Sequence, residues 1–184
     1  MYVVKNKIQS NLLIKKLNLN RFEEQIFDNT QIVEIQQFLE QYPAKYYTIR
    51  DKQNYGSMPN FRVQKYEVLG YCQNFTKFGI AVSTDNYNSK ILTGDIFIGT
   101  DHTLWLIATD QPYASGRDAE RDPVYLIDSD IFDKRIRHIK GLEYLINYLY
   151  RYHLLDIVVE FAVFSEKIGI NKDYVVIYEL RTHY

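Results

Sequence analysis

The sequence predicts an α+β fold in which antiparallel β-hairpins pack against helices. The runs Leu154 to Phe164 and Tyr174 to Arg181 are β-rich, and the turn residues between them predict an antiparallel hairpin. Residues 91–99 and 103–109 form a second apolar pair around a short polar turn. Other segments place apolar residues at helical spacing: 8–17, 32–42 and 141–153. Because strands follow one another in hairpins, a strict βαβ alternation is not expected.

The first 44 residues are expected to form a helical segment, followed by one α+β domain over residues 45–184. The second apolar stripe ends at Pro43, where a helix must stop. After it we expect a strand at 45–50, a polar loop from Asp51 to Asn60, a helix at 63–75 and a strand at 78–83.

The segment from Asp110 to Pro123 is expected to be a long irregular loop, because it is rich in Asp, Arg and Gly. Loops of this length inside a compact domain are more often functional than idle. The next element, at 141–153, is an amphipathic helix that leads directly into the strand carrying Glu160.

Composition excludes several classes of protein. With 184 residues, 46% hydrophobic and 24% charged, the chain is typical of a soluble globular protein of one domain or two small lobes. The net charge of −1 gives no attraction toward nucleic acid. No apolar run approaches the roughly 18 residues of a membrane span, and no signal peptide is recognisable at the N-terminus. The single Cys72 excludes an internal disulfide, so we expect a cytoplasmic protein.

Several familiar sites are also absent from the sequence. The four histidines lack metal-ligand spacing, and Cys72 lies on the apolar side of an expected helix, which disfavours a zinc site and a thiol nucleophile. No Gly-rich phosphate loop of the Walker or Rossmann type occurs. The basic run from Lys134 to Lys140 is interpreted as a solvated face, with an RNA-contacting patch as the alternative.

The most informative pair of residues is Glu160 and Glu179. If the C-terminal hairpin closes near residues 168–171, Glu160 lies opposite or diagonal to Glu179 in two hydrophobic strands. Like charges across a ladder are destabilising unless a cation lies between them or one is protonated. Mg²⁺ is the expected cation, because carboxylates hold it together with substrate phosphates. The alternative is that the strands are offset and the two side chains point to opposite faces.

Four basic residues are candidates for binding phosphate. Arg50 and the nearby Lys52 end a strand and begin a flexible loop, and Arg117 and Arg121 lie in the long loop before Pro123. For each pair the alternative is an ordinary solvated surface.

Two further residues lie inside strands. Asp95 interrupts an apolar strand and is either part of a site or a solvent-facing side chain. Arg181 shares a face with Glu179, since side chains two apart in a strand point the same way. A site that holds both a metal ion and a phosphate oxygen would use this arrangement; a surface ion pair is the alternative.

Taken in order, these segments resemble the nucleotide-binding half of an ATP-grasp enzyme, of the type found in phosphoenolpyruvate synthase and pyruvate phosphate dikinase. Thr48-Ile49-Arg50-Asp51-Lys52 is similar to a Val-Arg-Ser-Ser motif whose Arg contacts ATP phosphate. The segment from Asp156 to Ala162 is similar to an Asp-Ile-Glu-Trp-Ala motif whose Glu binds metal. Glu179-Leu180-Arg181 resembles the closing Leu-Gln-x-Arg-Pro motif. The resemblance covers roughly residues 45–181.

The resemblance implies an ATP-grasp-like fold with ATP and Mg²⁺ as cofactors. It implies nucleotide contacts from Arg50, Lys52, Asp95 and Arg181, catalytic roles for Arg181 and Arg117, and Mg²⁺ ligation by Glu160 and Glu179. The implied activity is that of a compact ligase or phosphotransferase, whose acceptor substrate the sequence does not identify.

Two other functions stay open at this point. One is a non-catalytic interaction protein, such as a phage-borne or defence-related inhibitor or accessory subunit, which would bind a protein partner or a second copy of the chain. The other is an RNA-associated protein that uses the basic run, although nucleic acid is the less expected partner. Binding to a membrane is not expected.

Overall fold

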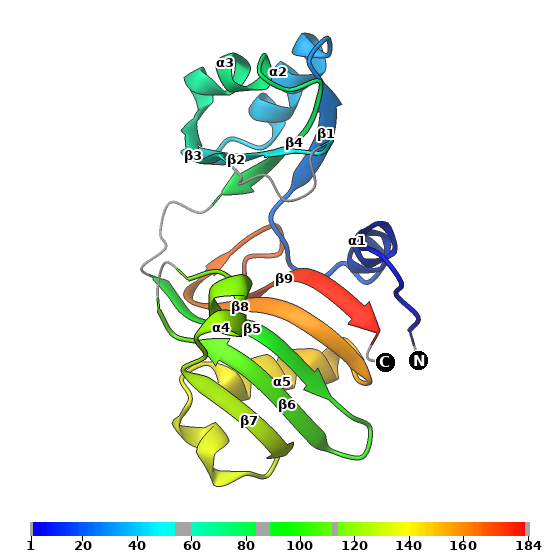
Figure 1. Ribbon diagram of the computed structural model, residues 1–184, viewed down its shortest axis with the longest axis vertical. Coiled ribbons are helices and arrows are strands. Elements are labelled where there is room, and N and C mark those ends of the chain that lie inside the picture. The colour runs from blue at the N-terminus through cyan, green and yellow to red at the C-terminus, as the bar shows by residue number, and fades with distance from the viewer. Residues whose placement is uncertain (1, 54–59, 84–88, 112–113, 183–184) are drawn as a thin grey trace. The chain divides into compact units, whose positions relative to one another are not determined.

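The computed structural model describes residues 2–53, 60–83, 89–111 and 114–182, and it confirms the predicted α+β class (Figure 1). The chain forms two compact units, each built around its own antiparallel sheet. The smaller unit is Phe22–Asn86, and the larger unit combines Met1–Arg21 with Tyr87–Tyr184. This division differs from the expected one at residue 44, because the N-terminal helix belongs to the larger unit and the second helix to the smaller.

The smaller unit has a four-stranded sheet in the order β1-β4-β2-β3. Its strands are β1 (Glu24–Asp28), β2 (Tyr46–Asp51), β3 (Asn60–Gln64) and β4 (Lys77–Ser83). Its helices are α2 (Ile32–Gln41), a 3₁₀ turn (Lys65–Glu67) and α3 (Val68–Cys72). The core of the unit contains buried residues of both α-helices and of the strands. Figure 1 shows both α-helices on the same side of this sheet.

The expected helix α2 and the strands β2 and β4 are confirmed, but two strands were missed. Strand β1 lies inside the segment that was expected to be helical. The segment is extended because it pairs with β4, and this pairing buries Phe27 against Phe38 and Phe78. The expected helix at 63–75 is largely wrong: Val63 pairs with Tyr47 in the ladder, and only residues 68–72 are α-helical. Most of the expected loop from Asp51 to Asn60 lies outside the described residues.

The larger unit has a five-stranded sheet in the order β7-β6-β5-β8-β9. Its strands are β5 (Lys90–Ile98), β6 (Thr103–Thr109), β7 (Tyr125–Asp130), β8 (Ile157–Ile168) and β9 (Asp173–Thr182). Its helices are α1 (Lys7–Lys16), α4 (Gly116–Arg121), a 3₁₀ turn (Lys134–His138) and α5 (Leu142–Arg151). Both predicted hairpins, β5 with β6 and β8 with β9, are confirmed.

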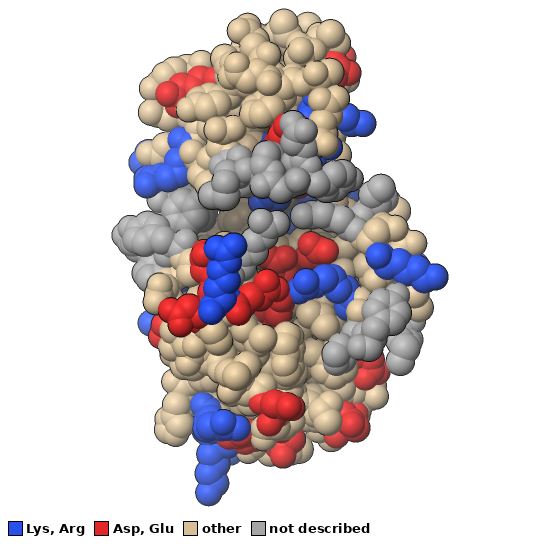
Figure 2. All heavy atoms as spheres, in the orientation of Figure 1, with Lys and Arg blue, Asp and Glu red and all other residues tan. Residues whose placement is uncertain are grey.

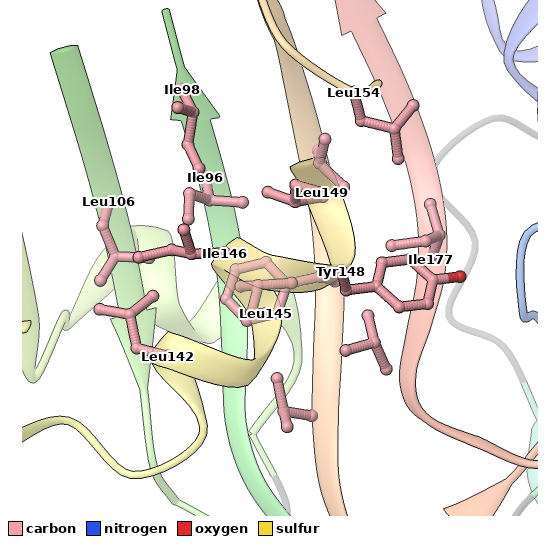
Figure 3. Close-up of a cluster of buried hydrophobic side chains, with 14 of the residues drawn as sticks. Ile96, Ile98, Leu106, Leu142, Leu145, Ile146, Tyr148, Leu149, Leu154 and Ile177 are labelled. Atoms are coloured by element: carbon pink, nitrogen blue, oxygen red, sulfur yellow. The ribbon is translucent and has the colours of Figure 1, made fainter. Parts of the chain in front are cut away.

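Helix α5 covers one face of this sheet, as its apolar stripe predicts. Leu145 and Leu149 are fully buried, and the helix lies against strand residues that include Ile96 and Ile177 (Figure 3). Burying each such side chain contributes about 1.5–3 kcal/mol. The N-terminal helix α1 lies beside β9, the last strand of the sheet, where the Ser10 hydroxyl accepts a hydrogen bond from the Leu180 amide at 2.8 Å. None of the helices in the described residues has the length and apolar character needed to cross a membrane.

The segment from Asp110 to Pro123 is not wholly irregular, which corrects the expectation from sequence. It contains α4, which begins at a capping box: Ser115 Oγ accepts from the Asp118 amide, and Asp118 Oδ2 accepts from the Ser115 amide at 2.7 Å. This Ser-x-x-Asp spacing is a sequence signal for a helix start that the composition of the segment obscured. Strand β7, which follows, was also missed.

Candidate functional site

Three carboxylates lie in a row across the centre of the larger sheet. In the strand ladders Asp95 of β5 is directly opposite Glu160 of β8, and Glu160 is directly opposite Glu179 of β9. Directly opposed residues share a face, so the alternative of offset strands with side chains on opposite faces is wrong. Their sequence neighbours Ile96 and Val159 belong to the core that includes α5, so the row lies on the other face.

A β-bulge adjoins this row. The register shifts from Glu160 opposite Glu179 to Phe161 opposite Ile177, so Tyr178 is an extra residue on β9. Bulges of this kind bend a strand and re-aim its side chains, and they are over-represented next to active sites.

Asp95 and Arg181 form a partly buried ion pair at one end of the row. Arg181 Nη2 donates to Asp95 Oδ2 at 2.6 Å, and Asp95 is only 3% exposed, so the alternative of a solvent-facing aspartate is wrong. Burial raises the pKa of Asp95; the hydrogen bond and charge of Arg181 oppose this effect, and the nearby Glu120 of α4 reinforces it. Within the described part of the chain, Asp95 Oδ1 is buried without a hydrogen-bond partner.

Arg181 places its positive charge among the carboxylates. Burial alone would lower its pKa, but the hydrogen bond to Asp95 and the charges of Asp95, Glu160 and Glu179 raise the pKa above its ordinary value. When Asp95, Glu160 and Glu179 are ionised, the Arg181 guanidinium is therefore attracted to all three carboxylates of the row.

Helix α4 lies over the same face of the sheet and approaches Glu160 closely. A Cβ atom on Gly116 would lie 2.8 Å from Glu160 Oε1, so glycine at the first position of α4 leaves room for this carboxyl group. Figure 2 shows acidic side chains gathered over α4 and the neighbouring strands, with basic side chains beside them. Arg117 is the second residue of α4, and its side chain lies outside the described residues.

The donor chemistry of this face suits Mg²⁺ only if other ligands complete the shell. In the described ranges, no group of three or more His, Cys, Asp or Glu side chains is arranged to hold a metal ion. Glu160 and Glu179 would supply the one or two carboxylates that Mg²⁺ commonly takes from protein, with phosphate oxygens and water supplying the rest. The residues present therefore fit a magnesium–phosphate complex better than an isolated ion.

Two of the predicted phosphate-binding residues lie in the smaller unit: Arg50 in β2 and Lys52 directly after the end of β2 at Asp51. Arg50 is half-buried, and its Nε has no hydrogen-bond partner among the described residues. Lys52 Nζ lies 2.7 Å from Glu24 Oε1 in an ion pair that the sequence did not indicate. A Cβ on Gly79 would lie 2.6 Å from both Glu24 Oε1 and Lys52 Cε, so glycine there makes room for this pair.

The structure thus brings four of the predicted site residues into one sheet: Asp95, Glu160, Glu179 and Arg181. Arg50 and Lys52 belong to the smaller unit, where Arg50 lies in β2 and Lys52 follows the end of this strand. Sequence reasoning missed that Glu120 lies near Asp95. Finding it would have required recognising α4 from the capping box at Ser115. Burial raises the pKa of the Cys72 thiol to about 12, which agrees with the expectation that this cysteine is not a nucleophile.

Comparison with known proteins gives matches among solved structures. No protein-family model matches the sequence, and no curated protein matches it. D-alanine-D-alanine ligase from Coxiella burnetii is similar with a TM-score of 0.48 and 9% identity. N5-carboxyaminoimidazole synthetase from Staphylococcus aureus, complexed with ADP, is similar with a TM-score of 0.49 and 10% identity.

A third similar structure is the macrocyclase MdnC from Microcystis aeruginosa, bound with its precursor peptide MdnA, with a TM-score of 0.48 and 14% identity. The three alignments cover 95–96% of this chain. They cover 47%, 44% and 50% of the ligase, the synthetase and the macrocyclase, in that order. The chain therefore spans about half the length of these solved structures.

Proposed function

We propose that the protein binds ATP in the manner of an ATP-grasp enzyme and acts as a compact ligase or phosphotransferase on an acceptor substrate. In this proposal Arg50, Lys52 and Arg181 contact phosphate, and Glu160 and Glu179 ligate Mg²⁺. The proposal rests on the order of the motifs in the sequence and on the chemistry of the carboxylate row. Catalytic roles for Arg181 and Arg117, and a nucleotide contact from Asp95, are part of the same proposal.

The observation that carries the proposal is the direct opposition of Asp95, Glu160 and Glu179 in three adjacent strands. Like charges directly opposite one another destabilise a sheet, so the row needs compensating positive charge. Arg181 supplies part of this charge through its 2.6 Å contact with Asp95. A Mg²⁺ ion brought by a nucleotide would add positive charge beside the two glutamates, whose carboxylate oxygens are ligands that Mg²⁺ accepts.

Each residue then has a definable task. Asp95 fixes one edge of the Arg181 guanidinium, whose other N–H groups donate to a phosphate oxygen. Glu160 and Glu179 accept the metal ion, and Gly116 keeps α4 clear of the Glu160 carboxyl. Mg²⁺ supplies charge neutralisation at the phosphates when it is bound.

Stabilisation by nucleotide is the first test of this proposal. We expect ATP with millimolar Mg²⁺ to raise the melting temperature, because ligand at 100 times its Kd stabilises the native state by about 2.7 kcal/mol. Without Mg²⁺ the shift should be much smaller. Calorimetry with ATP, ADP and GTP measures the same event directly. No heat and no thermal shift with any of them would rule the proposal out.

Replacing the paired glutamates is the second test. Glu160→Gln and Glu179→Gln should each abolish the stabilisation by Mg²⁺ and ATP, because a neutral amide is a poor ligand for a hard cation. Each should leave the stability of the ligand-free protein unchanged or higher, since a repulsive partner is removed. If both glutamates are instead structural hydrogen-bond acceptors, each variant should lose about 1–3 kcal/mol.

A matched control for this series is Glu143→Gln, because Glu143 is an exposed residue in the first turn of α5. It should keep both the stability and the nucleotide response of the wild type. Clear destabilisation of Glu160→Gln and Glu179→Gln, with no nucleotide response in the wild type, would contradict the proposed site.

A non-catalytic interaction protein is the second candidate function, and one observation favours it. Strand β7 forms an edge of the larger sheet, and Val124, Leu126 and Phe132 at or beside it are 49%, 62% and 73% exposed. Exposed apolar residues beside an open strand edge are typical of protein interaction surfaces. Absence of nucleotide binding together with intact folding would favour this candidate.

A further inference from the structure

A row of apolar side chains crosses the larger sheet beside the carboxylate row. In the strand ladders Phe97 of β5 is directly opposite Val158 of β8 on one side and Trp105 of β6 on the other. Phe97 lies two residues after Asp95 in the same strand, so the apolar row lies on the same face as the carboxylates. The three apolar side chains are half-buried, and each therefore keeps part of its surface exposed.

Apolar residues are unexpected at these three positions. Helix α5 packs on the opposite face, and strand positions that point away from a core usually carry polar side chains in an antiparallel sheet. Figure 2 shows an uncharged stretch of this face between the acidic cluster over α4 and the charged side chains at the far end of the larger unit. Exposed apolar surface with a polar rim is typical of binding sites in soluble proteins.

A carboxylate ends the apolar row at the edge strand. Asp128 of β7 is directly opposite Trp105, and side chains in this relation have Cβ atoms about 4.5–5.5 Å apart. Asp128 is exposed, and no ion pair among the described residues includes it. An indole ring attracts cations to its face, and a carboxylate accepts charge-assisted hydrogen bonds. The guanidinium group suits both neighbours at once, because it is planar, stacks on aromatic rings and donates two parallel N–H groups to a carboxylate.

We propose that Trp105 and Asp128 bind the guanidinium group of an arginine side chain in a peptide partner. Phe97 and Val158 then contact apolar residues that flank the arginine. The apolar row extends two strand spacings beyond Trp105, roughly 10 Å, which is the length of about three residues of an extended peptide. The site does not depend on nucleotide binding, because none of these four residues belongs to the carboxylate row or to the proposed nucleotide contacts.

The test is a titration of the wild-type protein with the blocked tripeptide acetyl-Leu-Arg-Leu-amide, followed by the fluorescence of Trp105, the single tryptophan. We expect a saturable change that weakens as the salt concentration rises, since exposed charges are screened. The same peptide with citrulline in place of arginine is neutral and nearly isosteric, and it should bind at least tenfold more weakly. The lysine peptide should also bind more weakly than the arginine peptide, because an ammonium group lacks the planar fork.

Three variants locate the site. Asp128→Asn should weaken binding of the arginine peptide at least tenfold and leave the citrulline peptide unchanged, because it removes only the charge of an exposed side chain. Glu143→Gln, at an exposed position of the helix on the opposite face, should change neither. Trp105→Leu should show no heat of binding in calorimetry. The proposal is overturned by the absence of a saturable change in the wild type, by equal affinity of the arginine peptide and either of the other two, or by wild-type affinity in Asp128→Asn.

Discussion

Gly94→Ala is expected to destabilise the larger unit by about 3–5 kcal/mol, through steric overlap and backbone strain together. A Cβ at this position would lie 2.0 Å from the carbonyl oxygen of Ile107 and 2.7 Å from Cα of Ala108. Both are backbone atoms of β6, so the overlap cannot be relieved by turning a side chain. The φ angle of +155° adds strain, because side-chain-bearing residues rarely adopt it.

The measurement is urea denaturation followed by the fluorescence of Trp105, the single tryptophan, which lies in β6 of the same unit. Gly70→Ala is the matched control, because a Cβ on Gly70 would meet no atom within 4 Å. Since Gly70 lies in helix α3, its replacement should raise local stability by about 0.5–1 kcal/mol. It should leave the Trp105 transition unchanged. A Gly94→Ala transition within 1 kcal/mol of the wild type would contradict the steric argument.

The C-terminal part of the fold could be predicted from sequence because its signals are local. The apolar run of β8, the turn around Gly169 and the apolar run of β9 are consecutive in the chain, so pairing and register follow from one turn. Gly169 adopts a φ of +84°, a backbone conformation that glycine adopts readily in a turn. The expectation that Glu160 lies opposite or diagonal to Glu179 came from the same local reasoning, and the strand ladder shows that the two residues are directly opposite.

The elements that were missed depend on distant parts of the chain. Strand β1 has only one buried residue, Phe27, and its pairing with β4 joins segments about fifty residues apart. Local periodicity therefore could not distinguish it from the end of a helical region. Helix α4 was missed for a different reason, since its charged composition masked a capping signal at Ser115.

In the candidate site, too, single residues could be recognised from the sequence, but the contacts between distant residues could not. Asp95 was noticed as a charge inside an apolar strand, but its position beside Glu160 depends on β5 pairing with β8, which joins strands from two hairpins. The Lys52–Glu24 ion pair likewise requires the fold of the smaller sheet. The roles assigned to these residues in binding ATP and Mg²⁺ came from a resemblance, and they stay predictions until nucleotide binding is measured.

Asn20→Ala is expected to destabilise the larger unit by about 3–4 kcal/mol, because one side chain closes the connection between β8 and β9. Its Nδ2 donates to the carbonyl oxygens of Ile168 at 2.7 Å and Val175 at 2.8 Å. Its Oδ1 accepts from the Asn171 amide at 2.9 Å. Asn20 is fully buried, so alanine would leave several backbone groups without partners, each costing about 1–3 kcal/mol where water does not replace the amide.

Two further substitutions make this expectation specific to the amide. Asn147→Ala, at an exposed position of α5, should change the free energy of unfolding by less than about 0.5 kcal/mol. Asn20→Asp keeps the size of the side chain but replaces the donating NH₂ group with an oxygen that faces two carbonyl oxygens. It should therefore destabilise at least as much as alanine, and more strongly as the pH rises and the buried carboxyl ionises. Urea denaturation monitored at Trp105 measures all three variants. If Asn20→Asp were as stable as the wild type, the hydrogen bonds donated by Asn20 would not stabilise the β8–β9 hairpin. The positions of Glu160 and Glu179 would then depend on the strand ladder alone.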